Sequence, residues 1–206
     1  EAGFIAEEGS GSLEEQEYCW VVDPLDGTSN YIHDCTPYCV SIALRNREEI
    51  LLGVVYECGR EELFWAHKNS RAYLNGKEIC VSDQSVLDQS FIMPELPYKA
   101  ERYSPFILPL MRDLYGHVSG IRMLGSAAAE LCYVAAGRFE IFIEAFLGPW
   151  DIAAGYIILK QAGGRMTDFS GNSNGPYAKE VLASNGKVHE ELLKVLQRHK
   201  KLLKHE

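Results

Sequence analysis

The stretch at residues 21–31, VVDPLDGTSNY, decides how the rest of the sequence is interpreted. The apolar run at residues 19–22 predicts a short buried strand, and an acidic segment that contains Pro24 follows it directly. Pro24 and the glycine after Asp26 turn the backbone, so the carboxylates of Asp23 and Asp26 can converge on one point. Such oxygen ligands suit Mg²⁺, which leaves coordination sites for water and phosphate. The competing interpretation is a strand that ends in an ordinary turn rich in Asp, Pro and Gly.

Gly27 and Thr28 continue this stretch and predict the start of a short helix. Backbone N–H groups at a helix start can bind an anion such as phosphate, and Thr28 adds a hydroxyl group. The sequence therefore places candidate metal ligands and candidate phosphate donors within one short segment.

Charge and composition limit the partners that this chain can have. With 206 residues, 47% hydrophobic residues and a formal net charge of −9, it is a globular protein for which nucleic acid and anionic membranes are unfavourable partners. No apolar run approaches the ~20 residues of a membrane span. The six cysteines contain no C-x-x-C pair, which predicts reduced, mostly buried thiols in a cytoplasmic protein and argues against a metal site at Cys35 and Cys39.

The pattern of apolar and turn residues predicts an α/β protein with two regions, residues 1–85 and 86–206. The first region favours antiparallel strands at 3–6, 40–44, 50–56 and 62–67, with a tight hairpin turn at Asn75-Gly76. The second alternates strands at 90–93, 117–123, 139–145, 165–167 and 181–183 with helices at 104–115, 125–137, 149–162 and 187–204. The boundary near residues 78–90 is expected to join two halves of one integrated unit.

Asp151 belongs to a second motif, WDIAAG at residues 150–155. It falls in the first turn of a helix that Pro149 is predicted to start. The helix dipole favours a carboxylate there, so Asp151 on its own is explained as a helix cap. About 125 residues separate Asp151 from Asp26, and the two motifs in this order are more informative than either one.

Together these motifs resemble the two signatures of the inositol monophosphatase family, which are Mg²⁺-dependent, lithium-sensitive phosphomonoesterases. The resemblance runs from Phe4 to the terminal helix and implies a layered α/β sandwich of the inositol monophosphatase and fructose-1,6-bisphosphatase type. Family members carry further helices before this point, so we expect this chain to be a fragment whose corresponding layer is exposed. The Asp-x-x-Asp spacing is one residue longer than the Asp-x-Asp of haloacid dehalogenases, which argues for direct attack by water.

The resemblance also implies roles for individual residues. Glu7, in the sequence FIAEE at residues 4–8, matches a third and weaker motif, and its alternative is a solvated charge beside Glu8. Two to three Mg²⁺ ions would be held by these carboxylates, with Thr28 and Glu7 orienting the attacking water. The implied metal ligands are Glu7, Asp23, the Leu25 carbonyl, Asp26 and Asp151; the implied catalytic residues are Glu7 and Thr28; the implied substrate-binding residues are Asp26, Gly27, Thr28, Gly125, Ser126, Ala127, Glu144 and Asp151.

Two of these assignments have a plain structural alternative. The small residues at 125–127 could simply allow a helix start to pack closely, and Glu144, matched to a ring-hydroxyl ligand, could be an ordinary strand carboxylate. Residues 29–31 resemble the inositol branch and lack the lysine and glutamate of adenosine bisphosphate phosphatases.

The sequence therefore predicts a phosphomonoesterase for a sugar or cyclitol phosphate, with myo-inositol monophosphate preferred. Fructose 1,6-bisphosphate, 3′-phosphoadenosine 5′-phosphate and histidinol phosphate are the alternatives within the same chemistry. A non-catalytic relative that binds regulatory partners is the alternative of another class. The expected partner is a small phosphorylated metabolite, and family members are often dimers, so a homodimer is also considered.

Overall fold

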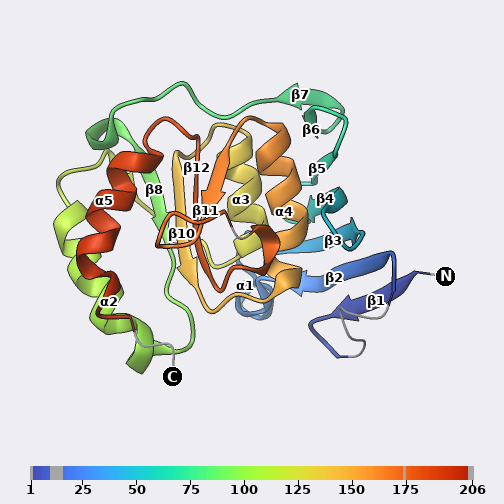
Figure 1. Cartoon of the computed structure of the whole chain (residues 1–206), viewed down its shortest axis with the longest axis horizontal. Coiled ribbons are helices and arrows are strands. Elements are labelled where there is room, and N and C mark those ends of the chain that lie inside the picture. Colours follow the sequence, from blue (N-terminus) through green and yellow to red (C-terminus); the bar gives the residue numbers. More distant parts are fainter. Residues whose placement is uncertain (1, 10–15, 174, 204–206) are drawn as a thin grey trace.

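Two sheets and the helices between and beside them build the chain (Figure 1). The structure is a computed structural model, and it describes residues 2–9, 16–173 and 175–203. Figure 1 shows four layers: a first sheet, helices α3 and α4, a second sheet, and helices α2 and α5. The predicted layered α/β sandwich is confirmed.

The first sheet has seven strands in the order β1-β2-β3-β4-β5-β6-β7. β1 pairs parallel with β2, and each later neighbour is antiparallel. Asn75 and Gly76 both have positive φ, at 46° and 78°, which confirms the predicted tight hairpin turn. The strands are β1 Gly3–Ala6, β2 Cys19–Asp26, β3 Cys39–Arg45, β4 Ile50–Glu57, β5 Glu62–His67, β6 Ala72–Leu74 and β7 Lys77–Ile79.

The second sheet has five strands in the order β11-β12-β10-β8-β9. Its central strand β10 is parallel to β8 and antiparallel to β12. Helices cover both faces, so central strands read as continuous apolar runs rather than as an alternating pattern. The strands are β8 Phe91–Pro94, β9 Gly120–Ile121, β10 Ile141–Ala145, β11 Arg165–Thr167 and β12 Glu180–Ser184.

The helices divide the apolar interior into two cores. Between the sheets, α3 and α4 bury small and branched side chains against both of them. On the far face of the second sheet, α2 and α5 pack against each other and against side chains such as Ile92 and Ile141. The helices are α1 Thr28–Ile32, α2 Ala100–Leu114, α3 Ala127–Ala135, α4 Pro149–Gln161 and α5 His189–Lys200, with 3₁₀ turns η1 Leu87–Gln89 and η2 Gly175–Tyr177.

Helix α4 approaches the first sheet closely at Gly53 of β4. A Cβ atom on Gly53 would lie 2.6 Å from the carbonyl oxygen of Ala154 and 2.5 Å from Cγ2 of Ile157. A side chain therefore cannot be accommodated without moving the helix. This contact holds α4 at a fixed distance from the first sheet, whose strand β2 carries the first motif.

Helix α2 differs most from its prediction. It was expected to start at Ser104–Pro105, but it begins at Ala100 and contains both Pro105 and Pro109. Each interior proline costs about 3 kcal/mol, so the pair costs about 6 kcal/mol. The helix nevertheless buries five side chains at about 1.5–3 kcal/mol each, which outweighs that cost: Tyr103, Phe106, Ile107, Leu110 and Leu114.

Other predicted bounds were also wrong in part. β2 was expected to end at residue 22 and continues to Asp26, whereas the strand expected at 117–123 is reduced to Gly120–Ile121. The terminal helix begins at His189 rather than at residue 187. Most of the acidic stretch at 9–17 lies outside the described residues.

The outer face of the first sheet is partly apolar and exposed. The outer face of the first sheet carries exposed Phe4, Trp20, Tyr56 and Leu63, which no described residue buries. No helix within the described ranges is long and apolar enough to cross a membrane. The six cysteines are unpaired, as predicted, but only three are buried: Cys19, Cys39 and Cys132 are buried, Cys58 is intermediate, and Cys35 and Cys80 are exposed.

Candidate active site

Asp23 and Asp26 come from the C-terminal part of β2, where the strand is irregular. Residues three apart on a regular strand point to opposite faces. The pairing with β3 shifts register between Asp23 and Asp26, which allows both carboxylates to reach one place. The Leu25 N–H donates a 2.9 Å hydrogen bond to Asp23 Oδ1 and fixes this irregular segment. The predicted convergence is confirmed, although a bulged strand rather than a turn produces it.

Gly27 ends the strand with a φ of 84°, a conformation that favours glycine. A Cβ atom there would lie 2.9 Å from the carbonyl oxygen of Pro37. The chain then enters α1, and Thr28 Oγ1 donates a 2.9 Å hydrogen bond to the Leu25 carbonyl. The hydroxyl and carbonyl that the resemblance assigns to catalysis and metal binding thus lie side by side.

The start of α3 holds Asp26 in place. Asp26 Oδ2 accepts hydrogen bonds from Ser126 Oγ at 2.6 Å and from the Ala128 N–H at 2.9 Å. Ser126 is 1% exposed and is not among the residues that line the cavity described below. The structure therefore shows Ser126 supporting Asp26, and its contact with substrate stays a prediction.

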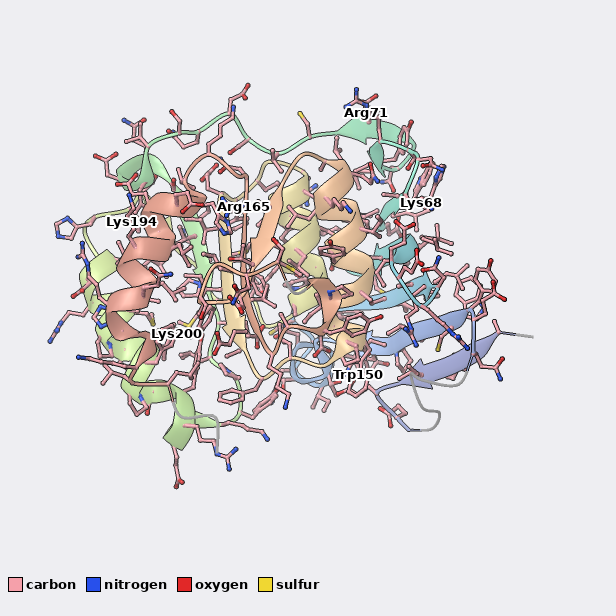
Figure 2. All side chains as sticks on the ribbon, in the orientation of Figure 1. Lys68, Arg71, Trp150, Arg165, Lys194 and Lys200 are labelled. Carbon is pink, nitrogen blue, oxygen red and sulfur yellow. The ribbon has the colours of Figure 1, made fainter. Side chains whose placement is uncertain are left out.

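Asp151 enters the site from the first turn of α4, as predicted. Its Oδ2 accepts a 2.7 Å hydrogen bond from the Gly148 N–H at the helix start. Ser41 of β3 donates to the Trp150 carbonyl at 3.1 Å and ties this helix start to the first sheet. Figure 2 labels Trp150 at this end of α4, away from the labelled lysines and arginines.

The three aspartates form a group that could hold a metal ion. One oxygen from each of Asp23, Asp26 and Asp151 lies within 4.8 Å of the others. Burial, followed by the charge of Asp26, raises the pKa of Asp151 to about 8 and that of Asp23 to about 7. Their mutual repulsion and hard oxygen donors fit a divalent cation, which would neutralise them.

These carboxylates open into a cavity of about 300 Å³. Six of the described lining residues are acidic, and Lys99 is the basic residue among them. Predicted site residues that line it are Glu7, Asp23, Leu25, Asp26, Gly27, Thr28, Gly125, Ala127, Glu144 and Asp151. Glu7 also contacts Asp23, and burial is the first cause of the raised pKa of Glu7.

Comparison with known proteins identifies the family. The sequence profile of the inositol monophosphatase family matches residues 1–201. The chain belongs to the inositol monophosphatase family. Members of this family are metal-dependent phosphatases that hydrolyse phosphate monoesters.

Individual relatives in the family agree in sequence and fold. The chain is 37% identical over 193 residues to a Thermotoga maritima protein named fructose-1,6-bisphosphatase/inositol-1-monophosphatase, covering 94% of this chain and 72% of that protein. It is 39% identical over 191 residues to the Escherichia coli Nus factor SuhB, covering 92% and 72%. The solved Thermotoga maritima IMPase superimposes with a TM-score of 0.88 at 36% identity, covering 97% and 75%.

In this member of the inositol monophosphatase family, two glutamates beside the cavity were missed from the sequence. Glu95 follows β8 and lines the cavity, and Glu130 lies on α3 and is fully buried. Both stand in apolar runs, at residues 91–97 and 127–136, without a lysine or arginine nearby in those runs. An acidic residue at the centre of an apolar run was the feature that could have identified them.

Proposed function

We propose that this chain is a Mg²⁺-dependent phosphomonoesterase for a sugar or cyclitol phosphate, with myo-inositol monophosphate as the preferred substrate. The observation that carries the proposal is the approach of Asp23, Asp26 and Asp151 to within 4.8 Å in the wall of a cavity. A cavity of about 300 Å³ is of the size that small ligands occupy.

Two to three Mg²⁺ ions are the proposed cofactor. Glu7, Asp23 and the Leu25 carbonyl would hold one, and Asp23, Asp26 and Asp151 would hold the second, with a third near Glu7. When bound, the metal supplies a water of lowered pKa and compensates charge on the leaving oxygen.

The residues of the chain itself supply orientation. Thr28 Oγ1 donates a hydrogen bond to the Leu25 carbonyl at 2.9 Å, and its remaining lone pairs, together with Glu7, would orient the attacking water. The N–H groups of Gly27 and Thr28, at the start of α1, would bind phosphate oxygens. Glu144, which also lines the cavity, would accept a hydrogen bond from a ring hydroxyl.

Membership of the family does not define the substrate, the assembly or the cellular compartment. The name of the Thermotoga maritima relative includes fructose 1,6-bisphosphatase, which makes fructose 1,6-bisphosphate the first alternative, followed by 3′-phosphoadenosine 5′-phosphate. We propose a small phosphorylated metabolite as the partner, a homodimer as the assembly and the cytoplasm as the compartment. The proposed cytoplasmic location rests on the cysteine pattern alone.

A phosphate-release assay over a panel of phosphomonoesters tests the proposal. We expect hydrolysis with Mg²⁺, loss of hydrolysis in excess chelator, recovery when Mg²⁺ is restored, and inhibition by Li⁺. Unchanged hydrolysis in excess chelator would contradict the metal assignment. Faster turnover of fructose 1,6-bisphosphate than of myo-inositol monophosphate would make fructose 1,6-bisphosphate the preferred substrate instead.

A binding role is the second candidate, because the Escherichia coli relative carries the name Nus factor. The aspartates of both motifs are intact here, which favours catalysis. A pull-down that recovers the same partner with wild-type protein and with the Asp151→Asn variant would show that binding does not need the catalytic carboxylates.

A further inference from the structure

Glu95 and Glu144 occupy equivalent places at the ends of two neighbouring strands. Ile143 of β10 pairs with Pro94 of β8 in a parallel register. The ladder continues by one residue, because the Glu95 N–H donates a 2.9 Å hydrogen bond to the Ile143 carbonyl. The backbones of Glu95 and Glu144 are therefore separated by about 4.8 Å, the spacing of hydrogen-bonded strands.

Both glutamates point to the same side of the second sheet. Met93 and Phe142 belong to the core on the α3 side, whereas Ile92 belongs to the core on the α2 and α5 side. Side chains alternate along a strand, so residues two positions beyond Met93 and Phe142 share their face. Glu95 and Glu144 accordingly both line the cavity.

Glu130 lies behind Glu95 and Glu144, and no described group donates a hydrogen bond to it. It is fully buried, and neither carboxyl oxygen finds a donor among the described residues. Its carboxyl group lies beside that of Glu95, whose Oε1 accepts from the Leu124 N–H at 2.7 Å. Two ionised carboxylates in contact would repel strongly at a buried site, whereas one shared proton makes the contact a hydrogen bond. Burial, followed by the charge of Glu95, raises the pKa of Glu130 well above its ordinary value.

We propose that Glu95 is a second hydroxyl acceptor beside Glu144, and that Glu130 positions it by donating a carboxyl hydrogen bond. Two acceptors on adjacent strands fit a phosphate ester of a ring polyol that has two neighbouring hydroxyls away from its phosphate. This inference rests on the proposed function and adds the requirement that the substrate carries two neighbouring hydroxyl groups.

Kinetics on two substrates test the inference with the holoenzyme in Mg²⁺. Myo-inositol 1-phosphate supplies the hydroxyls, and p-nitrophenyl phosphate lacks them and reports on folding and metal chemistry. Glu95→Gln should raise KM for inositol 1-phosphate about tenfold, with kcat and the p-nitrophenyl phosphate kinetics unchanged. The matched control is Glu140→Gln, because Glu140 is also buried near β10 but accepts from Ser82 and Phe91 outside the cavity.

A pair of substitutions at Glu130 tests the donated hydrogen bond. Glu130→Gln keeps a donor and should keep KM near the wild-type value, whereas Glu130→Met keeps the approximate size, removes the donor and should raise KM about as much as Glu95→Gln. Equal KM values for the two Glu130 variants would overturn the positioning role. If Glu130 only filled space in the core, the Gln and Met variants would have the same KM.

A deoxy substrate completes the test. An inositol phosphate that lacks the hydroxyl bound by Glu95 should have a KM about tenfold higher with wild-type protein and show no further rise with Glu95→Gln. An unchanged KM for inositol 1-phosphate in Glu95→Gln, with normal p-nitrophenyl phosphate hydrolysis, would overturn the inference. So would a lower KM for histidinol phosphate than for inositol 1-phosphate. Failure of the wild-type protein to hydrolyse either test substrate would instead contradict the proposed function.

Discussion

Two clusters of carboxyl groups in and beside the cavity differ in how their members are arranged. In the aspartate cluster, Asp23, Asp26 and Asp151 converge to within 4.8 Å from a strand end and a helix start. In the glutamate cluster, Glu95, Glu130 and Glu144 are not among the groups of described residues close enough to share a metal ion. Asp26 accepts several hydrogen bonds, whereas Glu130 accepts none from the described residues. The difference teaches that convergence and available donors, rather than the amount of charge, decide whether a carboxyl cluster favours a cation or a proton.

Asp151→Asn is expected to have the largest effect and would break the first side of this comparison. The amide removes a charge that compensates the metal at the leaving oxygen, an interaction that strengthens in the transition state. We expect kcat to fall about 100-fold or more on every phosphomonoester, measured by phosphate release in saturating Mg²⁺. Full activity of the variant would show that Asp151 only caps α4.

Glu144→Gln should have a smaller and different effect. The glutamate is proposed to bind a hydroxyl that does not react, so KM for inositol phosphate should rise about tenfold while kcat stays near its wild-type value. Steady-state kinetics with p-nitrophenyl phosphate provide the control and should not change. Equal rate losses on both substrates would place Glu144 with the metal ligands and remove the contrast between the two clusters.

The pH dependence of folding stability tests the aspartate cluster without any substrate. In metal-free protein the pKa of Asp151 is raised from 3.8 to about 8, so the folded state binds more protons than the unfolded state between these values. The free energy of unfolding should therefore fall as pH rises through that window. Urea titrations in chelator should show this slope, and Asp151→Asn should reduce it. A free energy of unfolding that rises over the same window would contradict the assignment of the shift.

Tyr98→Phe should have the smallest effect. The Tyr98 hydroxyl lies 2.5 Å from Ser29 Oγ and joins the rim beside Glu95 to the helix that carries Thr28. Tyr98 is 91% exposed, so the net contribution of this hydrogen bond is small. We expect about a twofold rise in KM for inositol phosphate in steady-state assays. A change of tenfold or more would mean that the segment after Glu95 and helix α1 are more strongly coupled than this contact indicates.

The sequence predicted the aspartate cluster better than the glutamate cluster. Asp23, Asp26 and Asp151 stand next to turn and helix-start residues, so local chemistry indicates where each carboxylate points. Glu95 and Glu130 meet only because β8 pairs with β10 and α3 packs beneath them, which no local pattern specifies. The start of α2 was predicted too late for a related reason. Its prolines indicated a helix boundary, but side chains buried against α5 favour a helix that begins at Ala100.

The close contact of α4 with Gly53 has a consequence for inherited variation in this protein. Alanine at that position would place one methyl group 2.6 Å from the Ala154 carbonyl oxygen, and the helix would have to move away with Asp151 at its first turn. An allele with this change would behave as a catalytic null although every proposed metal ligand is unaltered. A genetic screen for lost phosphatase activity would thus return a hit in the middle of a strand, where no chemistry takes place.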